Sequence, residues 1–135
     1  MIAEVVPLVD RGIYYFKCDK GHEEITVLQV PKYEVLFQSG LNAIIDGYHR
    51  EAVSSFVASL EKFYDFYIEA TLIKNGLPED QINDFKSKIN LSERKVGSFI
   101  SIYLNENKKI PKVLSSKDSE FRNKVIHDGK IPTRD

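Results

Sequence analysis

Three residues near the end of the chain have side chains that could together act on a phosphodiester. Arg122, Asn123 and His127 lie within six positions of one another, in a segment with the pattern of a terminal helix. A guanidinium group can hold the charge of a phosphate, and an imidazole can move the proton. Arg122 and His127 are ~140° apart around an ideal helix. They therefore converge only if the helix ends before His127, or through a second subunit.

The same residues also fit a purely structural interpretation. The chain has five arginines and three histidines, so an arginine and a histidine at this spacing often arise by chance. Arg122 could form an ion pair with Asp118 one helical turn earlier, while His127 simply ends the helix. The spacing therefore needs support from its context in the chain.

The turn between Cys18 and His22 contains two potential metal ligands. Structural zinc has four ligands, and a usual ribbon supplies two such pairs. Apart from His127, only His49 could add a further histidine or cysteine. We expect a turn with a buried thiol, without a bound metal or other cofactor. The alternatives are the remnant of a degenerate zinc ribbon and a site completed by a second subunit.

The elements that position these residues are mainly helical. Two β-type runs, residues 13–17 and 24–30, surround a glycine-containing turn and predict a hairpin. We therefore expect an all-α helical bundle in residues 31–135, preceded by a small β-hairpin domain in residues 1–30. Apolar residues at helical spacing predict helices at residues 32–45, 48–74, 79–89, 92–104 and 115–128.

The helix predicted at residues 48–74 is the strongest structural signal. At ~1.5 Å per residue it spans roughly 40 Å, long enough to be the central strut of a bundle. One face is apolar and is expected to face the core, and the other is polar and is expected to face solvent. The apolar stripe consists of Val53, Phe56, Val57, Leu60, Phe63, Tyr64, Tyr67 and Thr71. The polar face carries Arg50, Glu51, Ser54, Glu61, Lys62, Asp65 and Glu69.

Composition is that of an ordinary globular domain. Hydrophobic residues make up 42% and charged residues 29% of the 135 residues, and the formal net charge is −1. Without a basic excess, any binding of nucleic acid must be local. The single cysteine, the absence of a signal-peptide pattern and the absence of a long apolar run predict a cytoplasmic protein that does not enter the membrane.

Three segments resemble proteins of the HEPN superfamily, and together they cover roughly residues 10–131. The stretch R-N-K-V-I-H at 122–127 resembles the R-x4-6-H signature, in the R-N-x3-H form of the ribonuclease members. Residues 46–67 resemble the first long helix of bacterial and phage members. The C-D-K-G-H turn resembles the half zinc ribbon that precedes the domain in some of them. The resemblance implies a HEPN-like helical bundle.

The resemblance also implies an activity. Many HEPN domains are metal-independent endoribonucleases of toxin-antitoxin, abortive-infection and other phage-defence systems. By position, Arg122 would hold the scissile phosphate, His127 would act as general acid or base, and Asn123 would orient the phosphate or the histidine. Attack by the ribose 2′-OH would leave a cyclic phosphate. HEPN domains usually dimerise, so a homodimer or a HEPN-containing partner is expected, with RNA as the substrate.

The chain departs from the family pattern after His127. Eight residues follow, D-G-K-I-P-T-R-D, without a helical pattern, whereas HEPN proteins usually continue through a further helix. A bundle shortened at the C-terminus is therefore expected, with exposed apolar surface that favours association. The alternative function is an inactive HEPN protein that binds and modulates a HEPN partner or defence complex. A nucleotide-binding subunit is a third alternative, which no specific residue favours.

Overall fold

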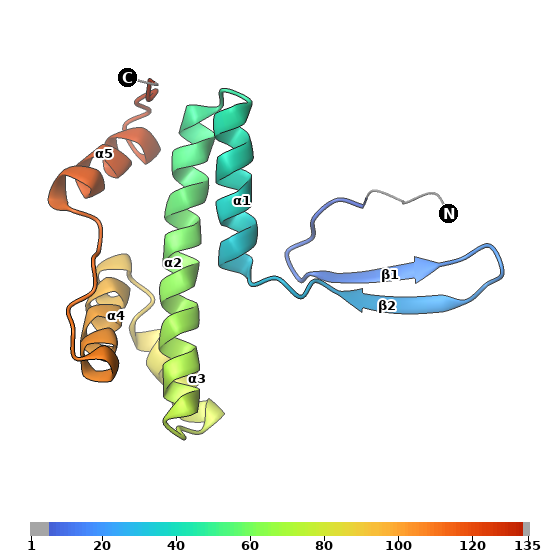
Figure 1. The fold of residues 1–135 in the computed structure, drawn as a ribbon, viewed down its shortest axis with the longest axis horizontal. Coiled ribbons are helices and arrows are strands. Elements are labelled where there is room, and N and C mark those ends of the chain that lie inside the picture. Colours follow the sequence, from blue (N-terminus) through green and yellow to red (C-terminus); the bar gives the residue numbers. More distant parts are fainter. Residues whose placement is uncertain (1–5, 134–135) are drawn as a thin grey trace. The chain divides into compact units, whose positions relative to one another are not determined.

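The computed structural model describes residues 6–133. The chain divides into two compact units, Met1–Pro31 and Lys32–Asp135. The first contains a two-stranded sheet and the second contains five helices (Figure 1). This confirms the prediction of a mostly helical chain with a small amino-terminal hairpin. Within the described residues, no helix is both long and apolar enough to cross a membrane.

The first unit is an antiparallel hairpin. β1 (Ile13–Lys17) pairs with β2 (Glu23–Val27), and their ends are in register. β2 is shorter than the predicted run of residues 24–30. The Leu28 amide still donates to the Gly12 carbonyl at 2.7 Å, but Gly12 has a φ of +61°. This left-handed conformation bends the chain away from the strand direction and ends the regular pairing.

The hairpin turn contains the two potential metal ligands. The Cys18 amide donates to the His22 carbonyl at 3.0 Å, and Gly21 adopts a φ of +81°. The Cys18 side chain is exposed, so the prediction of a buried thiol is wrong. The reason is local, because a two-stranded hairpin has no second layer of its own at its tip that could cover the sulfur atom.

The second unit contains the five predicted helices. α4 continues past its predicted end to Asn107, because Lys108 caps it in the left-handed conformation with a φ of 54°. Leu91 occupies the cap position of α4 and makes no side-chain hydrogen bond there, although Ser92 follows it. The Ser92 hydroxyl instead donates to Glu61 at 3.0 Å. The helices are α1 (Lys32–Ile45), α2 (His49–Lys74), α3 (Glu79–Lys88), α4 (Ser92–Asn107) and α5 (Ser116–Ile126).

α2 is the helix against which the others pack. α1, α3, α4 and α5 each approach α2 (Figure 1). In the part of the chain that the structure describes, all close backbone approaches between helices involve α2. With 26 residues it is ~39 Å long at ~1.5 Å per residue. Its surface therefore sets where α5, the helix with the candidate site, lies relative to the other helices.

The buried core surrounds the second half of α2. Tyr64, Ile68, Ile89 and Phe99 form its central cluster, and the rings of Tyr64 and Phe99 are 4.5 Å apart between centroids. Ile68 is 0% exposed although it is absent from the predicted apolar stripe. The stripe residues before Tyr64 are only partly buried. The predicted stripe thus faces the core only in part, since Tyr64 and Thr71 are buried while Leu60 and Phe63 are half-buried and pack against the buried cluster.

α1 and α2 pack closely at a glycine. Gly40 is the buried residue of α1, and a Cβ atom placed there would lie 2.7 Å from the Phe56 ring. A hydrogen bond also links the two helices, since the Ser59 hydroxyl donates to the Tyr33 carbonyl at 2.6 Å. The absence of a side chain at Gly40 lets the two backbones approach, and the Ser59 bond satisfies a buried hydroxyl.

Candidate functional site

α5 carries all three predicted site residues and has well-defined ends. Its first turn is closed by a capping box, in which the Ser115 hydroxyl accepts from the Asp118 amide at 3.2 Å. The Ser115 amide donates back to the Asp118 carboxylate at 3.1 Å. At the other end Gly129 has a φ of +71°, which only glycine adopts readily. Val125 is 0% exposed, and α5 packs against α2.

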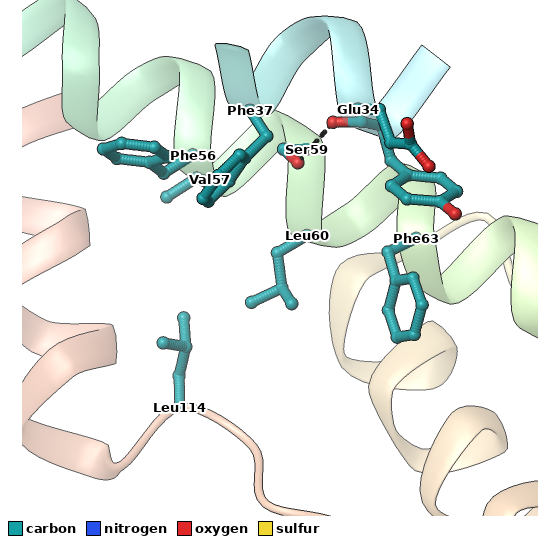
Figure 2. Close-up of a pocket in the computed structure, with 9 residues that line it drawn as sticks. Glu34, Phe37, Phe56, Val57, Ser59, Leu60, Phe63 and Leu114 are labelled. Carbon is teal, nitrogen blue, oxygen red and sulfur yellow. Dashed lines mark hydrogen bonds between the residues drawn. The ribbon is translucent and has the colours of Figure 1, made fainter. Parts of the chain in front are cut away.

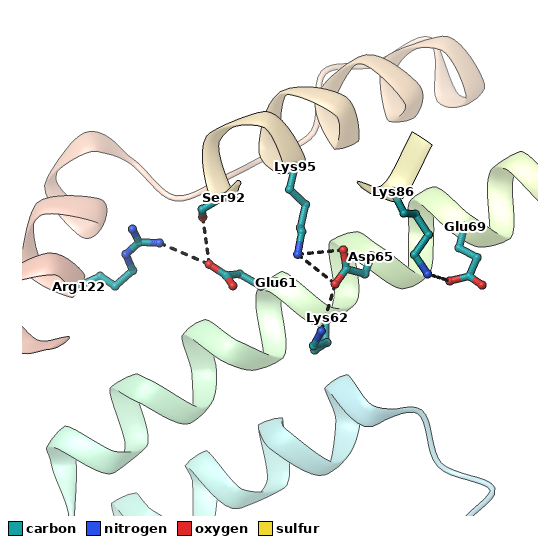
Figure 3. Close-up of polar contacts among 8 residues, drawn as sticks. All are labelled: Glu61, Lys62, Asp65, Glu69, Lys86, Ser92, Lys95 and Arg122. Carbon is teal, nitrogen blue, oxygen red and sulfur yellow. Dashed lines mark hydrogen bonds and ion pairs between the residues drawn. The ribbon is translucent and has the colours of Figure 1, made fainter. Parts of the chain in front are cut away.

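Arg122 is directed along α5 and toward α2 rather than toward solvent. Its Nε and NH2 groups both donate to the Asn123 side-chain oxygen, at 3.1 and 2.9 Å. Its NH1 group lies 3.9 Å from the Glu61 carboxylate of α2 (Figure 3). The side chain is 24% exposed. One edge of the guanidinium is therefore held by Asn123, and NH1 has only a long ion pair.

The proposed ion pair between Arg122 and Asp118 is not formed. The Asp118 carboxylate accepts from the Ser115 hydroxyl at 2.6 Å and from the Ser115 amide. These bonds lower the pKa of Asp118 below its ordinary value. The capping box competes successfully for this carboxylate, because Asp118 is at the third position of the helix, where the box requires an acceptor.

His127 lies at the end of α5, where it forms the carboxyl-terminal cap. Its amide donates to the Asn123 carbonyl at 2.8 Å, and both side chains are exposed. Residues one turn apart lie on the same face of a helix. Ile126 is the last helical residue, but His127 keeps right-handed helical backbone angles, so its side chain stays on the face of Asn123. Asn123 therefore lies between the Arg122 guanidinium and the face that carries His127.

Within the described residues, the side-chain contacts join Arg122 to Asn123 and Glu61, and none joins the His127 imidazole to either of the other two predicted residues. The structure thus brings Arg122 and Asn123 together directly. His127 is close to them only because it follows them at the end of the same helix.

The acidic side of α2 is a feature that the sequence interpretation missed. Glu61, Asp65 and Glu69 were expected to face solvent, but each contacts at least one residue of another helix (Figure 3). Their spacing of four residues puts them on one face of α2. The spacing could therefore have predicted that the three carboxylates share a face, but not which residues they contact. The contacts are Glu61 with Arg122 of α5 and Ser92 of α4, Asp65 with Lys95 of α4, and Glu69 with Lys86 of α3.

A small cavity lies beside the Arg122 guanidinium. Its volume is about 70 Å³, and its polar lining comes from Arg122, Glu61, Ser92 and Ser119. Tyr64 is part of the lining too, so the cavity extends to the edge of the core. This space accommodates water molecules but not a nucleotide. A larger ligand must therefore approach Arg122 from the surface of α5 rather than enter the cavity.

A larger and almost entirely apolar groove lies between α1, α2 and the segment that precedes α5 (Figure 2). Its volume is about 580 Å³. Several of its residues were predicted to be core residues, but they are only partly covered. The lining consists of Tyr33, Glu34, Phe37, Phe56, Val57, Ser59, Leu60, Phe63 and Leu114. We call this feature the apolar groove.

Comparisons with known proteins provide no further guide to the function. No family model, no curated protein and no solved structure matches the chain. The resemblance to HEPN proteins consequently rests on the quoted segments of the sequence. The function must be argued from the Arg122 site and from the surfaces of the helical unit.

Proposed function

We propose that this protein is a metal-independent endoribonuclease whose site consists of Arg122, Asn123 and His127. The observation that carries the proposal is the pair of hydrogen bonds from Arg122 to Asn123, at 3.1 and 2.9 Å. These bonds hold a planar cation next to the helix face that carries His127. A guanidinium and an imidazole on one surface can bind a phosphodiester and move its protons without a metal ion.

The reaction would be an internal transfer at phosphorus. The ribose 2′-oxygen attacks the adjacent phosphorus atom and loses its proton to a base, while the bond to the 5′-oxygen of the next nucleotide breaks and that oxygen gains a proton. The products are a cyclic phosphate and a free 5′-hydroxyl. Neutral His127 accepts the first proton, or its protonated form donates the second. Arg122 and the Asn123 amide nitrogen stabilise the charge on the phosphate oxygens.

Glu61 is the group with which the substrate must compete. Its carboxylate is 3.9 Å from Arg122 NH1, a distance at the limit of an ion pair, and it is 37% exposed. Partly exposed ion pairs of this kind are weak. A phosphate can accept two hydrogen bonds from a guanidinium, which makes it the stronger partner. Binding of RNA would therefore replace the Glu61 contact at NH1 while leaving the Asn123 contacts intact.

The test is incubation of the purified protein with mixed-sequence RNA in excess EDTA. Wild type should release fragments with cyclic phosphate ends, and His127→Ala should abolish this. Asn123→Asp should keep its bond to Arg122 but repel the phosphate, and should reduce the rate by ~100-fold or more. Arg122→Lys should also fail, because lysine lacks the planar fork.

Matched controls distinguish this site from general effects of charge. Arg50→Ala and His22→Ala each remove an exposed residue of the same type elsewhere in the chain, and both should retain full activity. A wild-type preparation without cleavage in EDTA, or an activity that survives His127→Ala, would refute the nuclease. We place the nuclease in a toxin-antitoxin or phage-defence setting on the resemblance to HEPN proteins alone.

A second candidate function is that of a binding protein. The apolar groove favours it, because about 580 Å³ of space lined mainly by aromatic and aliphatic side chains suits a protein partner rather than RNA. In that case the chain would bind and modulate a HEPN partner or a defence complex. Its biological effect would then survive His127→Ala, and substitutions in the groove would remove it.

A further inference from the structure

The basic charge of the chain is concentrated in the part that contains the candidate site. Residues 108–135 contain eight lysines and arginines against four aspartates and glutamates, a net charge of +4. Residues 1–107 contain eleven basic and sixteen acidic residues, a net charge of −5. The formal net charge of −1 therefore conceals an asymmetric distribution, and α5 lies in the basic part.

Four lysines lie close together at the start of this basic part. Lys108, Lys109, Lys112 and Lys117 belong to residues 108–117, K-K-I-P-K-V-L-S-S-K, which contain no aspartate or glutamate. This segment connects α4 with the first turn of α5 (Figure 1). All four lysines are exposed. Lys108 is set apart because its charge acts on Glu106 of α4. We call the other three lysines the lysine track.

The lysine track differs from the remaining lysines of the helices in its contacts. Each lysine of α2, α3 and α4 forms an ion pair with a carboxylate, and so does Lys124 of α5, at distances between 2.5 and 3.6 Å. In the part of the chain that the structure describes, no carboxylate forms an ion pair with a lysine of the track. These three charges are therefore available to a ligand without the loss of an internal contact.

The position of the lysine track relates it to the candidate site. The two residues that follow Lys112 line the cavity beside the Arg122 guanidinium. Lys117 lies in the first turn of α5, seven positions before Lys124, so the two lysines share a side of the helix. His127 follows Lys124 by three positions, and residues at this spacing are neighbours on a helix surface. The lysines of this part therefore follow one another from the end of α4 toward His127.

Exposed lysines in this arrangement suit the phosphates of a nucleic-acid strand. An ammonium group binds phosphate as a point charge, so it requires no fixed geometry of the side chain. Contacts with successive phosphates release counterions, which supplies most of the affinity that does not depend on sequence. Three cations spread over residues 109–117 match a chain of phosphates better than a single phosphate group.

We propose that the lysine track binds the phosphate backbone of RNA and guides the strand to Arg122 and His127. This inference rests on the nuclease function proposed above and adds the residues that supply affinity for the strand. The track contacts phosphates rather than base edges, so it contributes little sequence preference. The net negative charge of residues 1–107 repels the backbone from other surfaces, which confines the strand to this part of the chain.

The experiment measures binding of a fluorescently labelled, single-stranded RNA to the full chain with His127→Ala, so that cleavage does not interfere. Fluorescence anisotropy between about 50 and 200 mM salt gives the dissociation constant and its salt dependence. The triple variant Lys109→Gln, Lys112→Gln, Lys117→Gln should bind ~10-fold more weakly or worse. It should also reduce the slope of log K against log salt by about 2, since each phosphate contact on a single strand contributes ~0.7.

A matched control removes the same charge elsewhere. The triple variant Lys20→Gln, Lys62→Gln, Lys88→Gln replaces three exposed lysines outside the basic part and should keep both the affinity and the slope. Circular dichroism verifies that both triple variants are folded. The single variants of the track provide a second measurement, because each should reduce the slope by ~0.7.

Three results would overturn the proposal: no binding of RNA, an unchanged slope in the track variants, or an equal loss of affinity in the two triple variants. Binding to vesicles of anionic phospholipid that depends on the track, without binding of RNA, would assign these lysines to a membrane surface instead. The outcome is separable from the nuclease. Binding that depends on the track in a protein that cleaves nothing would keep the RNA-binding surface and refute the nuclease. Cleavage that the track variant leaves unchanged at low substrate concentration would refute the track alone.

Discussion

Asn123 accepts hydrogen bonds from both Nε and NH2 of Arg122, and this is the central contact of the candidate site at the scale of residues. A free arginine side chain loses considerable conformational entropy when it binds a phosphate, because it has many rotatable bonds. An arginine held by a neighbouring amide has lost part of that entropy in advance. In the proposed site, the contact would therefore favour binding of a phosphate even though it satisfies two of the guanidinium donors.

A prediction at the residue scale concerns two helical glycines. Gly40→Ala should destabilise the protein by ~1–3 kcal/mol, because the new Cβ would lie 2.7 Å from the Phe56 ring and force the helices apart. Gly97→Ala in α4 should instead stabilise it by ~0.5–1 kcal/mol, since the space around Gly97 is open and alanine is the better helix former. Urea unfolding followed by circular dichroism would measure both changes.

Each variant is the control for the other, because both replace a glycine within a helix by alanine. A stabilising Gly40→Ala would show that the Phe56 ring moves aside easily and that the α1–α2 contact does not require a glycine. A destabilising Gly97→Ala would show that α4 is packed more closely on that side than the structure indicates.

At the scale of elements, α2 organises the second unit with two different surfaces. Its apolar side supports the core and the groove, and its carboxylates at Glu61, Asp65 and Glu69 contact α5, α4 and α3 in turn. The most sheltered of these pairs joins Lys95 and Asp65 at 3.0 Å, with 13% and 22% of the side chains exposed. One helix thereby makes polar contacts with three others.

A prediction at the element scale concerns the capping box of α5. Hydrogen bonds from the Ser115 hydroxyl and amide lower the pKa of Asp118 below its ordinary value. Because the folded-state pKa is depressed, the stabilisation is present above the unfolded-state pKa and is lost as the pH falls through the folded-state pKa. Asp118→Asn should therefore lower stability at pH 7, and this difference from wild type should shrink below about pH 4.

Thermal unfolding at pH 7 and in the acid range would measure this difference. Ser115→Ala should cost about 1 kcal/mol at pH 7, as the loss of a helix cap does. Lys117→Ala, an exposed residue of the same first turn, is the control and should have little effect at either pH. If Asp118→Asn unfolds at the same temperature as wild type at pH 7, the capping box does not stabilise α5 in solution.

At the scale of the helical unit, the core is displaced toward one end of α2. The buried cluster surrounds Ile68 and Phe99, whereas Leu60 and Phe63 lie where the core meets the apolar groove. The half of α2 that packs against α1 therefore has an apolar side that the other helices cover only partly. This division separates the part of the unit that holds the buried core from the part whose apolar side chains stay partly exposed.

A prediction at this scale compares two large-to-small substitutions on α2. Ile68→Ala should cost ~2–5 kcal/mol, because the side chain is fully buried and a cavity would remain. Leu60→Ala should cost about 1 kcal/mol, since a side chain on the groove wall is only partly removed from water. Chemical denaturation would measure both losses of unfolding free energy. If the two losses were equal, or if Leu60→Ala cost more, the main core would not surround Ile68.

The sequence by itself determined the hairpin, the five helices and the presence of the Arg122, Asn123 and His127 set on the last of them. These features follow from local rules, because periodicity, capping residues and glycine turns act over a few positions. Tertiary structure alone decided that Glu61 meets Arg122, that Ile68 is buried and that Leu60 borders a groove. Residues 61 and 122 are far apart in the sequence, and neither helix specifies the partner of the other. Their contact depends on how α5 packs against α2, and the exposure of the groove depends on which helices cover α2 along its length.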